Sequence, residues 1–133
     1  AEVFGRMVSA LGGPPDFVSQ YKKLLPAAKV QMPVTPERDG YLSQVNAFAV
    51  GNAIIELGGG RRVLGEKLDL SVGFSNIAPI GGMVDRQVPL AIVHAATKAK
   101  AEQAAGLLRG ACTITGSKPK PRRVVYDTIM AEL

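Results

Sequence analysis

The spacing of apolar residues changes at Pro26 from helical to strand-like, and this change restricts the fold more than any other feature of the chain. In residues 1–11 apolar side chains recur at the spacing of an amphipathic helix, until the Gly and Pro residues at 12–15 end it. Asp16, a favoured capping residue, predicts a second helix that ends near Leu25. The chain is therefore expected to begin with two short helices, and any sheet must come from later residues.

Several later stretches have the pattern of strands, and two helices interrupt them. The predicted strands are residues 29–35, 41–45, 69–77, 88–95 and 111–115. Residues 78–87 are expected to form a turn, and residues 124–129 are expected to close the chain as a strand or short helix. Asn46 is a favoured N-cap for a helix that ends at the glycines 58–60, and Thr97 caps an alanine-rich helix that ends at Gly110. Helices first, followed by strands that two helices interrupt, predict the α+β class, and 133 residues predict one domain by length.

The two later helices also carry predictions about packing. Gly51 falls on the same helical face as Val50 and Ile54, so we expect another element to pack closely against it. Aromatic residues make up 5% of the chain and tryptophan is absent, so the core must be aliphatic and rich in alanine. The predicted inward stripe of the second of these helices is Ala101, Ala104, Ala105 and Leu108.

Composition and charge narrow the classes of protein that this chain can be. With 47% apolar and 20% charged residues the balance is that of a globular protein. One cysteine, Cys112, excludes an internal disulfide and a cysteine-based zinc site, and no apolar run is long enough to cross a bilayer. We therefore expect a cytoplasmic protein with no membrane partner.

The basic residues exceed the acidic ones by five, but they lie in separate clusters without interleaved aromatic residues. The clusters are Lys22-Lys23, Arg61-Arg62 and the segment Lys118 to Arg123. Binding to a nucleic acid needs a continuous cationic surface or stacking rings, so we expect no nucleic-acid partner. Such binding is kept as a third hypothesis, which predicts an affinity for DNA that depends steeply on salt.

Residues 57–62, "LGGGRR", resemble a loop that binds phosphate, but their order argues against it. A phosphate loop lies before a helix, whereas these glycines follow one and meet the negative end of its dipole. The Lys-Ser or Lys-Thr of a P-loop is also missing after Gly60. We interpret the glycines as a left-handed C-cap whose carbonyl end Arg61 and Arg62 can neutralise.

The remaining reactive residues do not form a recognisable catalytic or metal-binding pattern. His94 is the only histidine and is interpreted as structural, and Cys112 is interpreted as a small core residue. The acidic residues stand singly, without the spacing of metal ligands. They include Asp16, Glu37, Asp39, Glu56, Glu66, Asp69 and Asp85. The sequence therefore assigns no catalytic, substrate-binding, cofactor-binding or metal-binding residue.

Two segments, "VQMPVTPERDGYLSQV" and "IGGMVDRQVPLAIV", are similar to the strand-turn-strand units of biotinyl and lipoyl carrier domains. The lysine of a carrier, in a setting such as Met-Lys-Met, is absent from both. We read this similarity as shared architecture. It leaves a free-standing hammerhead or barrel-sandwich binding module as the alternative function.

Several motifs in order resemble the C-terminal part of the thymidine phosphorylase and pyrimidine nucleoside phosphorylase family. They are "MVSALGGPPDFVSQY", "LPAAKV", "GYLSQVNAFAVGNAIIELGGGRR", "LDLSVGFSNIAPIGG" and "VPLAIVHA". Arg86 departs from the family, which often has a glycine in this turn. The resemblance implies an α/β-hammerhead domain at 29–133 with a mixed sheet and flanking helices, and a helical segment at 1–28 that continues from a missing upstream domain.

The resemblance also implies an activity for the full-length enzyme. The family's members are homodimers that split thymidine with inorganic phosphate, as a co-substrate, into thymine and 2-deoxy-α-D-ribose 1-phosphate, and they use no cofactor. Their signature, similar to "SGRGLxxTGGTxDxLE", does not occur in this chain. The resemblance therefore implies a pentosyltransferase whose catalytic residues lie upstream, with the rest of the same polypeptide as partner and this fragment inactive alone.

Overall fold

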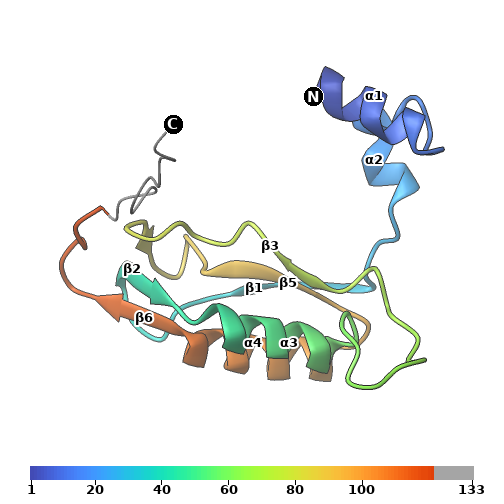
Figure 1. Ribbon diagram of the computed structural model, residues 1–133. Coiled ribbons are helices and arrows are strands. Elements are labelled where there is room, and N and C mark those ends of the chain that lie inside the picture. The colour runs from blue at the N-terminus through green and yellow to red at the C-terminus, as the bar shows by residue number, and fades with distance from the viewer. Residues whose placement is uncertain (122–133) are drawn as a thin grey trace, which may run out of the picture.

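Figure 1 shows the computed structural model of the chain, which describes residues 1–121. The predicted final element at 124–129, and Arg122 and Arg123 of the basic segment, lie outside the described residues. Within residues 1–121, four helices and six strands confirm the α+β class. No helix of this part of the chain has both the length and the apolar character needed to cross a membrane.

The chain begins with a helical hairpin, as the sequence predicts. Helix α1 spans Glu2–Ala10 and helix α2 spans Phe17–Leu24. The rings of Phe4 and Phe17 meet edge to face, with centroids 6.1 Å apart. No residue of either helix is buried, and the hairpin lies apart from the rest of the described chain (Figure 1).

The strands form two small sheets of three strands each. The first sheet has the order β1-β5-β3, with β1 at Val30–Val34, β5 at Ala91–Ala95 and β3 at Gly73–Ser75. The second has the order β4-β2-β6, with β4 at Met83–Val84, β2 at Gly40–Val45 and β6 at Cys112–Thr115. The consecutive strands β1 and β2 therefore belong to different sheets.

All the strand pairs of the described residues are antiparallel, so the expectation of a mixed sheet was wrong. A strand-helix-strand unit gives parallel neighbours only when both of its strands join the same sheet. Here the strands before and after each central helix lie in different sheets: β2 and β3 flank one helix, and β5 and β6 flank the other. No parallel pair results.

The two central helices begin at the predicted caps. Helix α3 spans Ala47–Leu57, and the backbone N–H of Ala49 donates to Oδ1 of Asn46 at 3.1 Å. Helix α4 spans Lys98–Ala111, one residue longer than predicted, and the N–H of Lys100 donates to Oγ1 of Thr97 at 3.3 Å. The helices pack against each other below the first sheet in Figure 1.

The core lies between these helices and the two sheets, and it is aliphatic as predicted. Its largest fully buried side chains are Leu42, Leu57, Leu90, Leu108, Val34, Val84 and Val93. The predicted stripe of α4 is buried throughout, because small alanine side chains let α4 approach its neighbours closely.

The prediction for Gly51 was wrong. Gly51 is exposed, and a Cβ atom added there would meet no heavy atom within 4 Å. The buried residues of α3 are Ala53 and Leu57. Because most residues of this helix are apolar, its sequence contains two overlapping apolar stripes, and contact with α4 selects the other one.

Two strands are shorter than predicted by more than two residues, and one strand was not predicted. Strand β3 covers only three of the residues expected at 69–77, because Asp69 forms a turn with Ser71 and Asn76 has a φ of 50°. Strand β5 begins three residues after Val88, since Pro89 has no N–H to donate to a ladder. The two-residue β4 falls in a stretch that was expected to be a turn.

Candidate functional site

The glycine run after Leu57 ends helix α3 as a left-handed cap, which confirms the interpretation from sequence. Gly58 has φ 101° and ψ 7°, a conformation that favours glycine. Its N–H donates to the carbonyl of Ile55 at 2.9 Å, and the N–H of Gly59 donates to the carbonyl of Ile54 at 3.0 Å. These two bonds satisfy carbonyl groups that the end of a helix would otherwise leave without partners.

The next two glycines are required by close packing. A Cβ atom at Gly59 would lie 3.0 Å from Cγ2 of Ile54, and one at Gly60 would lie 2.5 Å from Cγ1 of Ile55. The loop thus folds back against the last turn of α3. Because the N–H groups of Gly58 and Gly59 already donate to helix carbonyls, neither is available to a phosphate.

The cation that donates to the carbonyl end of α3 is a lysine from another helix, so the role expected for Arg62 was wrong. The guanidinium of Arg62 contacts the carboxylate of Glu56, and its backbone N–H donates to Oε2 of Glu66 at 2.7 Å. Nζ of Lys100, in the first turn of α4, donates to the carbonyl of Leu57 at 3.3 Å. Sequence reasoning missed this contact because 43 residues separate the two partners.

An open pocket of about 360 Å³ lies beside this cap. Its charged lining carries both signs, with Arg62, Lys67 and Lys100 opposite Glu56 and Glu66. Of these side chains, Arg62 contacts the carboxylate of Glu56. This contact and the bond from the N–H of Arg62 to Glu66 hold the loop that follows α3.

Asp69 fixes the far end of the same loop. Its backbone N–H donates to the carbonyl of Gly58 at 2.9 Å. Its Oδ1 accepts from the hydroxyl of Ser71 at 2.6 Å and from the N–H of Ser71 at 3.0 Å. These hydrogen bonds hold the pKa of the Asp69 carboxyl below its ordinary value, and the bond from the Ser71 hydroxyl has the largest effect.

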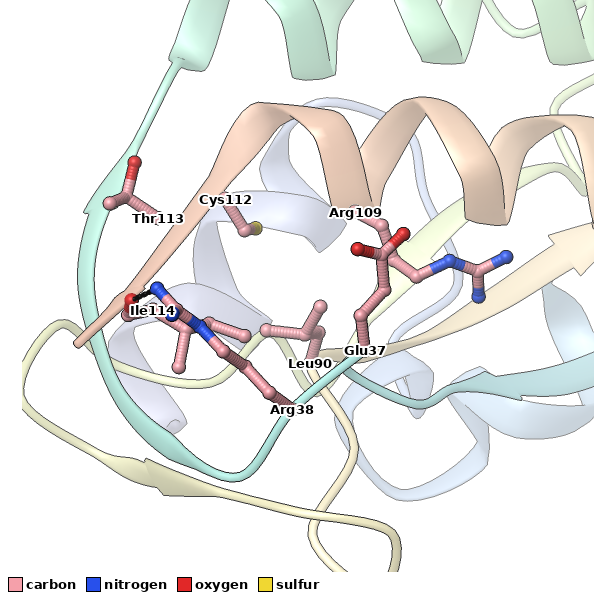
Figure 2. A pocket seen from close by; sticks show the side chains of 7 residues that line it. All are labelled: Glu37, Arg38, Leu90, Arg109, Cys112, Thr113 and Ile114. Atoms are coloured by element: carbon pink, nitrogen blue, oxygen red, sulfur yellow. Dashed lines mark hydrogen bonds between the residues drawn. The ribbon is translucent and has the colours of Figure 1, made fainter. Parts of the chain in front are cut away.

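A larger pocket, of about 510 Å³, lies between the β1–β2 connection, the end of α4 and the start of β6 (Figure 2). Leu90, Cys112 and Ile114 form its apolar part, and three charged side chains lie around it. They are Glu37, Arg38 and Arg109.

The cations around this pocket have structural roles. Arg38 donates to the backbone carbonyl of Ile114, which ties the β1–β2 connection to β6 (Figure 2). Arg109 lies in the last turn of α4, where a positive charge suits the dipole of the helix. The sequence gives no local signal for the bond from Arg38, since its partner is 76 residues away.

Cys112 packs against the core, as interpreted from sequence, and its side chain is half-buried. Burial raises the pKa of the thiol above its ordinary value, because the thiolate would lose its hydration. A cysteine in this state is a thiol at neutral pH, which is a poor nucleophile.

His94 lies on β5 and has a single polar partner from the neighbouring strand. Its Nε2 is 2.7 Å from Oγ of Ser75 on β3, and both side chains are partly buried. Ser75 faces Ile92 in the register, so the contact with His94 is a diagonal one across the strand pair. It joins two strands of the first sheet and has the geometry of a structural contact.

Residues 1–121 contain no group of three or more His, Cys, Asp or Glu side chains that could hold a metal ion. Of the basic clusters, Lys22-Lys23 lies in the hairpin, Arg61-Arg62 follows the glycine cap, and Lys118 and Lys120 follow β6. In the part of the chain that the structure describes, these clusters therefore belong to three separate segments.

Comparison with known protein families gives a match to the centre of the chain. Residues 41–115 match the family model described as the pyrimidine nucleoside phosphorylase C-terminal domain. The matched segment runs from β2 to β6 and contains the glycine cap, both central helices and the smaller pocket. Of the larger pocket it contains every lining residue except Glu37 and Arg38. It covers more than half of the chain.

Proposed function

This chain belongs to the pyrimidine nucleoside phosphorylases as one of their C-terminal domains, and from this membership we propose that it supports the phosphorolysis of thymidine without supplying a catalytic group. The family match from β2 to β6 is the observation that carries the proposal. It concerns the folded centre of the chain and does not depend on a single motif.

The proposed reaction of the full-length enzyme transfers a pentosyl group. An oxygen of inorganic phosphate bonds to the anomeric carbon of the sugar while the bond from that carbon to the pyrimidine nitrogen breaks. Thymine takes the electron pair and a proton, and 2-deoxy-α-D-ribose 1-phosphate is the second product. Phosphate is the co-substrate, and no cofactor takes part.

Such a reaction needs groups that hold an anion and that stabilise both a cationic sugar and a departing base. The candidate groups of this chain have structural partners instead: His94 contacts Ser75, Arg62 contacts Glu56, and Lys100 donates to a helix end. This supports the proposal that the catalytic groups lie in a preceding part of the polypeptide. The enzyme is proposed to be a cytoplasmic homodimer without nucleic-acid or membrane partners.

The role proposed for the domain is that of a rigid support for the catalytic part. Rigid neighbouring elements hold a binding site in its productive geometry, and they move as one body when a cleft closes. Three contacts of the domain provide such rigidity. They are the glycine cap of α3, the hydrogen bond from Lys100 to the carbonyl of Leu57, and the hydrogen bond from Arg38 to the carbonyl of Ile114.

An assay of the purified chain tests the assignment of catalysis to another part of the protein. The chain is incubated with phosphate and either thymidine or uridine, and the released base is measured by chromatography. We expect no thymine and no uracil above the rate of a sample without protein. Release of either base that depends on phosphate would contradict the proposal.

A further inference from the structure

We infer that the α1–α2 hairpin and an apolar groove beside β5 together form the surface by which this domain docks onto the catalytic part of the phosphorylase. The inference rests on the proposed function, which supplies the partner, and it adds the residues of contact. We call the two parts the hairpin face and the loop groove.

The hairpin face is an apolar stripe on both helices that nothing in the described chain covers. The exposed fractions of six of its residues range from 44% for Tyr21 to 84% for Leu11. These residues are Val3, Phe4, Met7, Leu11, Tyr21 and Leu25. Monomeric proteins seldom leave so many large apolar side chains together in water, so this face is expected to meet another protein surface.

The stability of the hairpin leads to the same expectation. Its helices have nine and eight residues, and helices shorter than about 12 residues are marginal in water unless they pack on something. The edge-to-face contact of Phe4 with Phe17 joins the two helices, but it leaves both rings partly exposed. The hairpin needs a partner to keep this geometry.

The loop groove is a pocket of about 460 Å³ whose walls are almost entirely apolar. Six of its residues are Ile77, Pro79, Met83, Val88, Pro89 and Ile92. Ile77, Met83 and Val88 are each about half exposed, at 47%, 48% and 49%. The groove therefore presents an apolar surface that water covers when the chain is alone.

Both parts lie on the same side of the first sheet. Ile92 alternates along β5 with Ala91 and Val93, which are fully buried toward α4, so Ile92 lies on the outer face. Figure 1 shows the hairpin on that side of the sheet, away from α3 and α4. One partner body can therefore contact both surfaces.

The size of the combined surface fits a stable interface. The two parts together present nine large apolar side chains that are each at least 44% exposed, and a standard interface buries about 800 Å² on each partner. A second copy of the chain is less suited, because the chain carries a net charge of +5 and two copies would repel each other. The family match adds that the chain is a C-terminal domain, so its relatives carry a preceding part.

A fused protein tests the docking surface. The chain is joined to the catalytic part of a pyrimidine nucleoside phosphorylase in place of that enzyme's own C-terminal domain. Hydrogen exchange of the hairpin amides is then compared between the fused protein and the chain alone. We expect at least about tenfold slower exchange in the fused protein, because a docked hairpin opens less often.

Three variants of the fused protein locate the contact. Leu11→Asp alters the hairpin face, Met83→Asp alters the loop groove, and Leu64→Asp is the matched control at a fully exposed residue outside both. Burying a carboxylate against an apolar partner is unfavourable, so Leu11→Asp should return hairpin exchange to the rate of the chain alone. Met83→Asp should speed it at least about threefold, and Leu64→Asp should leave it unchanged.

The possible results distinguish a failure of the proposed docking surface from a failure of the proposed function. Equal hairpin exchange in the fused protein and the chain alone would overturn the docking surface, and so would equal effects of Leu11→Asp and Leu64→Asp. Hairpin protection in the chain alone that rises with its concentration would assign the face to a second copy and also overturn it. A fused protein with a protected hairpin but no phosphorolysis would contradict the proposed function and leave the surface intact.

Discussion

Gly51 and Gly60 in the α3 region differ in whether a glycine, compared with an alanine, favours the folded state. Gly60 has no room for a side chain, whereas Gly51 lies in the exposed interior of the helix with open space around it. The first glycine is required by packing. The second only costs helix propensity.

Alanine substitutions at these two positions should therefore change stability in opposite directions. Gly60→Ala forces a Cβ atom against Ile55 and should lower the free energy of unfolding by about 1–3 kcal/mol. Gly51→Ala should raise it by about 0.5–1 kcal/mol. Urea unfolding of both variants measures the difference, and a Gly60→Ala protein as stable as the original would show that the loop is not packed as described.

The carboxylate of Asp69 contributes to the way in which stability depends on pH. Hydrogen bonds from Ser71 hold the pKa of Asp69 below its ordinary value of 3.8, so the carboxylate favours the folded state. This contribution is fully present above the ordinary pKa and is lost as the pH falls through the lower pKa of the folded state. Compared with Ser71→Ala, the original chain should be more stable at pH 7, and the gap should shrink as the pH falls below 3.8.

Unfolding by urea at a series of pH values measures that gap directly. A gap that stays constant from pH 7 down to the acid transition would mean that the hydroxyl of Ser71 acts through packing and not through the charge of Asp69.

At the scale of elements, the helices could be predicted and the strand pairing could not. The side chains of Asn46 and Thr97 accept from N–H groups three residues away, and Gly58 ends the helix just before it. Their roles can therefore be predicted from the neighbouring sequence alone. Strand partners depend on the path of the whole chain. Residues 29–35 and 41–45 were correctly read as strands, but nothing between them indicates that they join different sheets.

The contacts of the candidate site also fall into those that could be predicted from sequence and those that could not. The cap of α3 was predicted because the position of glycines after a helix is a local signal. Lys100 and Arg38 were missed because each donates to a carbonyl far away in the sequence, and any lysine or arginine could do so.

The bond from Lys100 joins α4 to the end of α3, and its loss should weaken the contact between the two helices. Lys100→Met leaves the carbonyl of the nearly buried Leu57 without this donor and should cost about 1–2 kcal/mol of unfolding free energy. Lys98→Met is the control, since Nζ of Lys98 is exposed and lies 3.8 Å from Glu102. The control should cost less than about 0.5 kcal/mol, and equal costs in thermal unfolding would argue against the role of Lys100.

At the scale of the whole molecule, the chain combines a well-packed centre with an uncovered outer side. The core between the sheets and the central helices is aliphatic and closed, while the hairpin and the loop groove leave large apolar side chains in water. This asymmetry is typical of a domain that completes its packing against another part of a protein. It agrees with the family of C-terminal domains to which the chain belongs.

We propose that this domain supports phosphorolysis and that the catalytic groups lie in another part of the polypeptide. The most direct measurement is the rate at which thymine is released from thymidine and phosphate by three samples. They are the chain alone, the catalytic part of a pyrimidine nucleoside phosphorylase without its C-terminal domain, and the two fused. We expect no release by the chain alone and faster release by the fused protein than by the catalytic part. Release by the chain alone, or equal rates with and without the fused chain, would contradict it.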